Sequence, residues 1–326
     1  MSDPTTAQVP VTVLTGYLGA GKTTLLNRIL TEQHGHKYAV VINEFGELGV
    51  DNDLVVDTDE EVFQMNNGCI CCTVRGDLIR ILNGLMRRRG KFEGILIETT
   101  GLANPAPVAQ TFFVDDEVRA KTRLDAIITV VDAKNLPARL ADSHEAVDQI
   151  AFADVIVLNK VDLVSPAELK AVEGAIRKIN HFARILPAEH AKVDIGTLLN
   201  RGAFDLKRIL ADHPKFLEDD SHEHNDDVYS ISFELQRPVD PQKFNAWMSQ
   251  VLAEHGQDLL RTKGILDYAG EDQRFAFQAV HMMADGDFIG PWKKDEKRLS
   301  RLVFIGRNMN RPQLRRGFEA CQVDAA

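Results

Sequence analysis

The chain has 326 residues, which is too long for a single small core and suits about two domains. Hydrophobic residues make up 44 % of it and charged residues 26 %, which excludes an extensively disordered chain, and its apolar runs are too short to cross a membrane. A formal net charge of −10 argues against a nucleic-acid-binding protein, because the overall field repels a phosphate backbone.

The start of the chain and the cysteine content predict the compartment. Met1 to Gln8 is polar and lacks the apolar core of a secretion signal, which predicts a cytoplasmic location. Of the four cysteines, three lie between Cys69 and Cys72, so a secreted disulfide framework is not expected.

Strands and helices are predicted to alternate through the first part of the chain. Val11–Leu14 has the apolar pattern of a buried strand, and Leu25–Leu30 has helical apolar spacing. A helix is expected over 75–88, and further buried strands are expected at Tyr38–Ile42, Glu61–Met65, Gly94–Ile97, Ala126–Val131 and Val155–Leu158. This alternation predicts an α/β fold over residues 8–212, with a parallel sheet covered by helices on both faces. The phosphate-loop sequence described below makes it a fold of the P-loop NTPase type.

The pattern changes after a highly acidic stretch at 213–227, which we interpret as a linker because so many carboxylates cannot be buried. Residues 228–323 are predicted to form a smaller α+β domain. Strands are expected at Val228–Leu235, Arg274–Val280 and Ser300–Ile305, with helices at Pro241–Glu254, opened by Asp240, and at Arg311–Cys321.

The stretch Gly16–Thr24, with the sequence GYLGAGKTT, fits the phosphate-loop pattern in full and stands between a predicted strand and helix. Its glycines let backbone N–H groups point inward, the helix adds its positive end, and the lysine adds a full charge. The threonine hydroxyl is expected to bind Mg²⁺. The predicted phosphate-binding residues are Gly16, Gly19, Ala20, Gly21, Lys22, Thr23 and Thr24, with Lys22 also catalytic and Thr23 on the magnesium ion.

The tetrapeptide from Asn159 to Asp162 follows a buried strand and narrows the base to guanine. The carboxylate of Asp162 can accept hydrogen bonds from the N1–H and N2 amino groups of guanine, which adenine does not offer. The stem of Lys160 can cover the base, while Asn159 is expected to tie this loop to the phosphate loop. A weaker expectation is that the loop 187–189 supplies a backbone contact to the base. The structural alternative is that Asp162 is the solvated N-cap of a helix. A measured preference for ATP over GTP would instead favour an ATP-dependent kinase with the same phosphate loop.

Glu98 and Gly101 stand where many nucleotide switches carry a carboxylate and a glycine near the γ-phosphate. Glu98 is predicted to act on Mg²⁺ directly, through water, or by positioning the attacking water, and the sequence leaves these roles open. Gly101 offers its N–H to the γ-phosphate. Asp132 is a rival carboxylate at another strand end, with a capping role as the alternative, and we rank it behind Glu98.

Cys69, Cys71 and Cys72 place three thiols within four positions, which suits a soft or borderline ion such as zinc. If the segment is extended, Cys69 and Cys71 share one face and bind together, with Cys72 turned into the core or used in another state. Buried cysteine packing is the structural alternative. Glu44 and Glu47 are candidates to complete the ligand set.

Taken together, GYLGAGKTT, NEFGE, NGCICC, ETTGLANP, NKVD and the second-domain segments at 259–264 and 277–280 resemble the CobW-like metallochaperone P-loop GTPases, in particular their YjiA-type members. The resemblance covers nearly the whole chain. It implies GTP hydrolysis to GDP with Mg²⁺ at the phosphates, coupled to handling of a transition metal, most often Zn²⁺, on the C-I-C-C segment. Many relatives carry a long histidine-rich tract between the domains, whereas this chain has only His222 and His224, so we favour a solvated linker over metal capture there.

We therefore expect a GTPase that transfers zinc to a client metalloprotein, with GTP ordering the segment 44–49 and the cysteine loop. Alternatives are an activator of one particular metalloenzyme, a cobalt chaperone in cobalamin assembly, and a non-enzymatic metal buffer. The sequence identifies neither the client nor the oligomeric state, for which a homodimer is one option.

Overall fold

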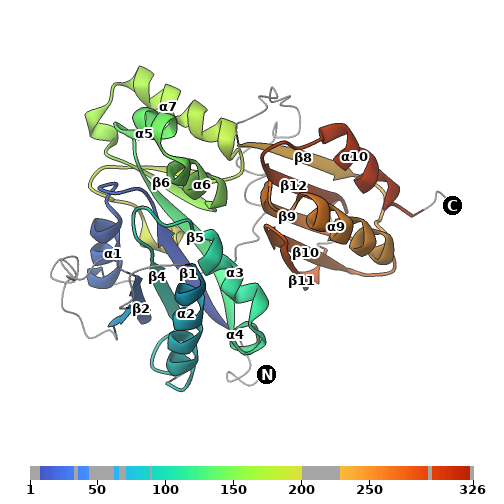
Figure 1. The fold of residues 1–326 in the computed structure, drawn as a ribbon, viewed down its shortest axis with the longest axis horizontal. Helices are drawn as coiled ribbons and strands as arrows, with labels where there is room; N and C mark the ends of the chain where they lie inside the picture. Colours follow the sequence, from blue (N-terminus) through green and yellow to red (C-terminus); the bar gives the residue numbers. More distant parts are fainter. Residues whose placement is uncertain are drawn as a thin grey trace. The chain divides into compact units, whose positions relative to one another are not determined.

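The structure, a computed structural model, describes residues 8–32, 36–43, 62–65, 71–88, 90–199, 228–292 and 296–323 (Figure 1). The chain divides into two compact units, Met1–Arg177 with Phe182–Ala203, and Lys178–His181 with Phe204–Ala326. Each unit is described separately below. The acidic stretch 213–227, including His222 and His224, lies outside the described residues.

The first unit is built on a parallel sheet of seven described strands in the order β3-β2-β4-β1-β5-β6-β7. This confirms the predicted α/β fold class. The strands are β1 Val9–Thr15, β2 Tyr38–Asn43, β3 Val62–Met65, β4 Gly94–Glu98, β5 Thr122–Asp132, β6 Val155–Asn159 and β7 Arg184–Ala188.

The strand β7 is the one that the sequence did not predict. Pro187 and Ala188 were expected in a loop, but they end β7, which pairs only with β6 in the described sheet. Four of its five residues are not fully buried, so it lacks the continuous apolar run of the inner strands. Proline is tolerated there because an edge strand has no second neighbour that needs its N–H.

Helices cover both faces of this sheet. The helix α1 (Lys22–Thr31) packs Leu25, Leu26 and Ile29 in one cluster with side chains from β1, β2, β4, β5 and β6. On the opposite face, α2 (Cys71–Met86) contacts α3 (Ala106–Val114) and α4 (Asp116–Lys121), and α3 and α6 (His144–Phe152) contact β5 (Figure 1). Successive strand residues point to opposite faces, so a strand buried on both sides reads as an unbroken apolar run. The remaining described helices are α5 Leu136–Asp142 and α7 Pro166–Ile179, with 3₁₀ turns at Val161–Leu163 and Ile195–Thr197.

The second unit is an antiparallel sheet of five described strands in the order β11-β10-β9-β12-β8, with two helices. Its core centres on Phe244, which is fully buried on α9 and meets the ring of Phe277 edge-on at 5.3 Å. Asp240 accepts hydrogen bonds from the N–H groups of Gln242 and Lys243, so it caps α9 as expected. The elements are β8 Tyr229–Leu235, α9 Pro241–His255, β9 Leu259–Asp267, β10 Gln273–Val280, β11 Met283–Pro291, β12 Ser300–Gly306 and α10 Arg311–Ala320.

Two strands of this unit, β9 and β11, were not predicted as strands. The charges of Arg261 and Lys263 and a glycine at 264 interrupt the pattern of β9. The strand β11 contains two glycines and is largely exposed. Neither strand shows the alternation that reveals a half-buried strand.

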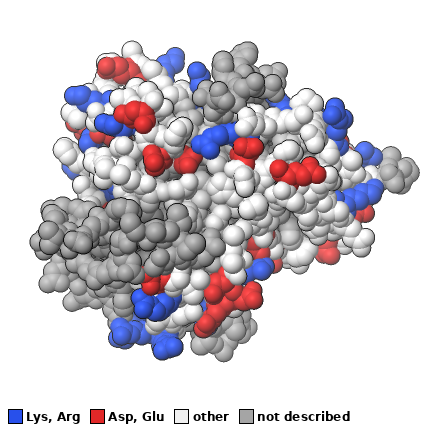
Figure 2. Space-filling view, viewed as in Figure 1, with Lys and Arg blue, Asp and Glu red and all other residues white. Residues whose placement is uncertain are grey.

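Acidic and basic side chains are interspersed over much of the described surface drawn in Figure 2. Within the described ranges, no helix is both long and apolar enough to span a membrane.

Candidate functional site

The phosphate loop connects the end of β1 to the start of α1 through three glycines in the left-handed region. Gly16, Gly19 and Gly21 have φ of 141°, 73° and 111°. A Cβ at Gly16 would lie 2.2 Å from the carbonyl oxygen of Val130, and one at Gly21 would lie 2.5 Å from Nδ2 of Asn159. Only glycine suits these positions, because both the backbone conformation and the close approach exclude a side chain. The loop therefore has the curled form that a phosphate-binding nest requires.

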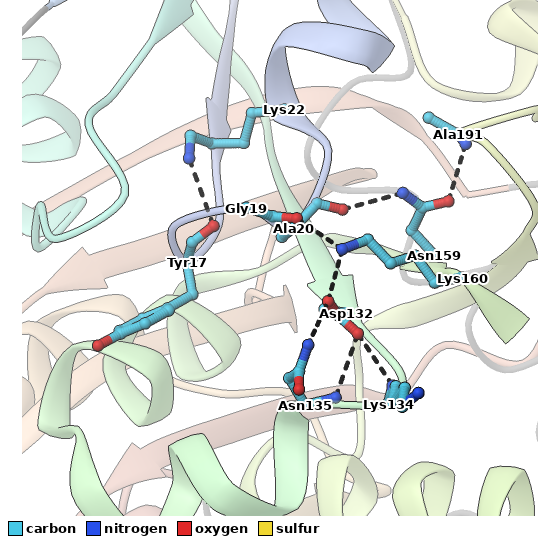
Figure 3. A network of polar contacts seen from close by, with 10 residues as sticks. All are labelled: Tyr17, Gly19, Ala20, Lys22, Asp132, Lys134, Asn135, Asn159, Lys160 and Ala191. Atoms are coloured by element: carbon cyan, nitrogen blue, oxygen red, sulfur yellow. Dashed lines mark hydrogen bonds and ion pairs between the residues drawn. The ribbon is translucent and has the colours of Figure 1, made fainter. Parts of the chain in front are cut away.

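Lys22 and Thr23 begin α1 beside the end of β4. The ammonium of Lys22 is 3.4 Å from the carbonyl oxygen of Tyr17 and folds back over the loop (Figure 3). The hydroxyl of Thr23 lies 3.5 Å from Oε1 of Glu98, whose side chain is buried. Glu98 reaches this position because β4 pairs with β1 in register, with Leu14 opposite Glu98. A hydroxyl and a carboxylate at this separation are the hard oxygen donors that Mg²⁺ prefers, so these residues fit the ion.

Asn159 ties together two loops from opposite ends of the unit's sequence. Its amide donates to the carbonyl oxygen of Ala20 at 2.9 Å, and its side-chain oxygen accepts from the N–H of Ala191 at 2.8 Å (Figure 3). All three residues are buried. The contact with the phosphate loop was expected from the sequence, whereas Ala191 was not, because its left-handed backbone (φ 55°) carries no mark in the residue type.

Lys160 also contacts the phosphate loop. Its ammonium donates to the carbonyl oxygen of Gly19 at 2.8 Å and pairs with Asp132 at 2.7 Å (Figure 3). Asp132 in turn accepts from the N–H groups of Lys134 and Asn135 and from the Asn135 side chain. Burial acts to raise the pKa of Asp132, but the hydrogen bonds from Lys160 and Asn135 outweigh it and the pKa lies below its usual value. Asp132 thus has the capping role considered from the sequence, together with an ion pair that the sequence did not suggest.

Asp162 lies in the 3₁₀ turn after β6 and is exposed. The turn starts at Lys160, whose left-handed backbone (φ 64°) reverses the chain at the end of the strand. The carboxylate of Asp162 is therefore open to a ligand while Asn159, three residues earlier, is buried. On the neighbouring strand end, Ala188 is buried and Glu189 is exposed.

Gly101 follows β4 and packs directly against the phosphate loop. A Cβ there would lie 2.7 Å from both the backbone nitrogen and the side chain of Leu18. The chain just before Gly101 is also held in place, because the hydroxyl of Thr99 lies 2.9 Å from the hydroxyl of Thr15 at the end of β1. The carboxylate, the glycine and the phosphate loop are thus brought together at one edge of the sheet.

The predicted metal ligands are not brought together by the described residues. Cys69, Glu44 and Glu47 lie outside them, and of Cys71 and Cys72 the structure gives only the backbone. That backbone is helical, since α2 begins at Cys71 and not at residue 75. The interpretation of Cys71 as part of an extended segment is therefore wrong, because it lies in the first turn of a helix. Among the described side chains, no group of three metal-binding residues is present.

Comparison with known proteins places the chain in a family. Residues 10–187 match the family described as CobW/HypB/UreG, nucleotide-binding domain. The chain belongs to the CobW/HypB/UreG family. Residues 228–322 match the family described as the cobalamin synthesis protein cobW C-terminal domain, so the resemblance stated from the sequence is confirmed over both parts.

Several relatives within the CobW/HypB/UreG family are similar over nearly their whole length. The zinc chaperone YjiA of Escherichia coli K12 is 37 % identical, covering 95 % of this chain and 98 % of its own. The zinc chaperone CobW of a Sinorhizobium species is 35 % identical, over 92 % and 93 %. The crystal structure of Zn(II)-bound YjiA GTPase from E. coli superposes with a TM-score of 0.73 at 31 % identity, covering 97 % of this chain and 100 % of that one.

Proposed function

We propose that this chain hydrolyses GTP and couples the nucleotide cycle to the binding and transfer of zinc to a client metalloprotein. The observation that carries the proposal is the bridge of Asn159 between the phosphate loop and Ala191, which brings an exposed Asp162 to the same edge of the sheet. The names of the full-length relatives, zinc chaperones in two bacteria, support the zinc half.

The guanine preference rests on the chemistry of Asp162. An exposed carboxylate can accept two hydrogen bonds from guanine, and adenine would leave it unpaired. Lys160 holds the loop in place, and its ammonium is already engaged by Gly19 and Asp132. Its aliphatic stem remains available to cover the base.

Hydrolysis is assigned to the group around the phosphate loop. Thr23 and Glu98 are the residues that would hold Mg²⁺, which when bound would neutralise negative charge on the phosphates. We assign Lys22 to supply a positive charge to the β- and γ-phosphates and the N–H of Gly101 to donate to the γ-phosphate. Glu98, buried at the strand end, would bind the ion directly or through water, or would position the attacking water.

Zinc is the proposed cargo, with Cys69, Cys71, Cys72, Glu44 and Glu47 as ligands. Thiolates and carboxylates suit this ion, and Cys71 and Cys72 are the first two residues of α2, where the positive end of a helix favours ionised thiols. A variant of the E. coli relative with one glutamate and two cysteines replaced by alanine was also crystallised with Zn(II) bound. Metal content alone is therefore a weak test, and stoichiometry and affinity are needed.

Two experiments test the proposal. Purified protein should hydrolyse GTP in preference to ATP, and Lys22→Ala should abolish turnover, whereas unaltered turnover in this variant would refute the site. Zinc titration against a competing chelator should show one tight site that Cys71→Ala weakens while GDP binding is unchanged. Equal zinc affinity in the two proteins would remove the cysteines from the site.

A second candidate function is activation of one particular metalloenzyme. A relative in Schizosaccharomyces pombe, 34 % identical over 95 % of this chain, is named zinc-regulated GTPase metalloprotein activator 1. The two functions differ in the breadth of clients and in the metal delivered. Affinity capture with the GTP-loaded protein, followed by metal analysis of the captured client, separates them. We place the protein in the cytoplasm, where a reducing environment would keep the thiols at 69–72 available for a metal ion. Whether it forms a homodimer is an outcome of sedimentation analysis.

A further inference from the structure

We propose that Gln149 is a positioning residue for GTP hydrolysis, which fixes the peptide groups around Gly101. This inference rests on the proposed function. It concerns a buried side chain on α6 that no sequence motif marks.

Gln149 joins three segments of the first unit. Its side-chain amide donates to the carbonyl oxygens of Gly101 and Ala103, each at 3.1 Å. The backbone carbonyl oxygen of Gln149 accepts from the hydroxyl of Thr129 on β5 at 2.8 Å. Gln149 and Thr129 are each only 1 % exposed, so the hydrogen bonds to Gly101 and from Thr129 are shielded from water, and the one to Ala103 is partly shielded. The backbone of α6 is thus anchored to the sheet, while the side chain of Gln149 holds the loop after β4.

Gly101 needs such a restraint because it is a glycine. Leu18 excludes any side chain at this position, because a Cβ on Gly101 would lie only 2.7 Å from it. Glycine, however, leaves both backbone dihedrals free and offers the chain no intrinsic preference for one conformation. The hydrogen bonds from Gln149 fix the peptide group that joins Gly101 to Leu102 and the one that joins Ala103 to Asn104. The N–H of Ala103 in turn donates to the carbonyl oxygen of Thr100 at 3.1 Å, and that carbonyl shares a peptide group with the Gly101 N–H. The turn that Gln149 holds therefore also restricts the direction of the N–H assigned to the γ-phosphate.

A second, exposed tether runs from the same helix to the same loop. Asn104 donates to the carboxylate of Asp148 at 2.9 Å, and its side-chain oxygen accepts from the N–H of Ala106 at 2.8 Å at the start of α3. Adjacent residues of α6 therefore hold both ends of the loop. Gln149 also lines a cavity of about 350 Å³ next to Tyr17 and Leu18, so the clamp borders the phosphate loop itself.

Removing the hydrogen bonds of Gln149 should affect only the contact with the γ-phosphate. GDP lacks this group and relies on the phosphate loop and on Asn159 to Asp162, which Gln149 does not contact in the hydrogen bonds described. Removing the clamp should therefore lower turnover and the preference for GTP over GDP without lowering GDP affinity. A general loosening of the fold would weaken both nucleotides.

The test uses the full chain with two variants that remove the amide, Gln149→Leu and the unbranched Gln149→Met. Gln250→Leu is the matched control. Gln250 also donates one amide hydrogen bond, to Glu254 at 2.8 Å, but on an exposed face of α9. Each Gln149 variant should lower kcat for GTP about tenfold and leave the affinity for a fluorescent GDP within about twofold. Hydrogen exchange over residues 99–105 should accelerate in both variants. The control should match the wild type.

The outcomes separate the two proposals. If the wild type hydrolyses GTP and both variants keep its kcat and its exchange rates, the positioning role is refuted and the proposed function stands. If the wild type does not hydrolyse GTP, the proposed function fails, and accelerated exchange at 99–105 still establishes that Gln149 holds the loop. Loss of cooperative melting or of GDP binding in both variants would also refute the role, because Gln149 would then be a purely structural residue.

Discussion

Asn159→Ala tests whether the bridge between the phosphate loop and Ala191 holds the nucleotide site in place. The substitution strands the carbonyl oxygen of Ala20 and the N–H of Ala191, which are 1 % and 0 % exposed by residue. Each stranded buried group costs about 1–3 kcal/mol, and water entering the space left by the amide favours the lower half of that range. We expect the free energy of unfolding of the first unit to fall by about 2–4 kcal/mol, which is a melting shift of roughly 5–15 °C for a unit of this size.

Differential scanning calorimetry measures the effect, and the chain carries its own reference. Both tryptophans, Trp247 and Trp292, lie in the second unit, so tryptophan fluorescence follows that unit alone. The fluorescence transition should stay in place while the calorimetric transition of the first unit moves. Gln8→Ala is the matched control, because Gln8 donates one amide hydrogen bond at 2.7 Å on an exposed surface. It should cost less than about 1 kcal/mol.

Equal losses in Asn159→Ala and Gln8→Ala would contradict the reasoning, because burial would then add nothing to the cost of the lost hydrogen bonds. A parallel shift of the fluorescence transition would contradict the assignment of the loss to the first unit. GDP affinity should fall together with stability, because the same amide orients the phosphate loop.

Three further predictions concern the same site. Asp162→Asn should lower GTP affinity about 100-fold and raise the affinity for xanthosine triphosphate. The reason is that an amide donates to the C2 oxygen of xanthine, where the carboxylate accepted from the amino group of guanine. Nucleotide competition measures both affinities, and an unchanged GTP affinity would refute the base assignment. Gly16→Ala should abolish nucleotide binding, because its Cβ would lie 2.2 Å from the Val130 carbonyl oxygen, and retained fluorescent-GDP binding would contradict this. Burial acts to raise the pKa of Asp132, but the hydrogen bond from Lys160 helps to hold it below the usual 3.8. The ionised carboxylate therefore stabilises the folded state above that pH. In urea unfolding, the wild type should have a higher free energy of unfolding than Asp132→Asn, and this difference should vanish as the pH falls below the pKa. A difference that is independent of pH would refute the ion-pair account.

Much of the sheet could be predicted because its inner strands are buried on both faces. β1, β2, β4 and β6 read as short apolar runs followed by polar residues, and the structure ends these strands within about two residues of the predicted positions. The strands that escaped prediction are those that local composition does not mark. β7 is an edge strand with a proline, and β9 buries the polar side chains of Arg261, Thr262 and Asp267.

The candidate site divides in the same way. The phosphate loop and the bond from Asn159 to Ala20 follow from motifs in which each residue type has a local physical reason. The pair of Lys160 with Asp132 and the clamp by Gln149 do not, because they join strand ends and helices far apart in the sequence. Such contacts depend on the packing of α6 on the sheet, which no short window of sequence contains. Cys71 is a case in which the local conformation was predicted wrongly. The cysteine motif predicted a metal ligand in an extended segment, but Cys71 lies in a helix.

The central claim is that nucleotide and zinc binding are coupled. Isothermal titration of zinc into the full chain, loaded first with a non-hydrolysable GTP analogue and then with GDP, tests it directly. The account predicts different zinc affinities in the two states and, by linkage, an equal factor in the affinity for the GTP analogue relative to GDP when zinc is bound. Identical zinc affinities in the two nucleotide states would contradict it.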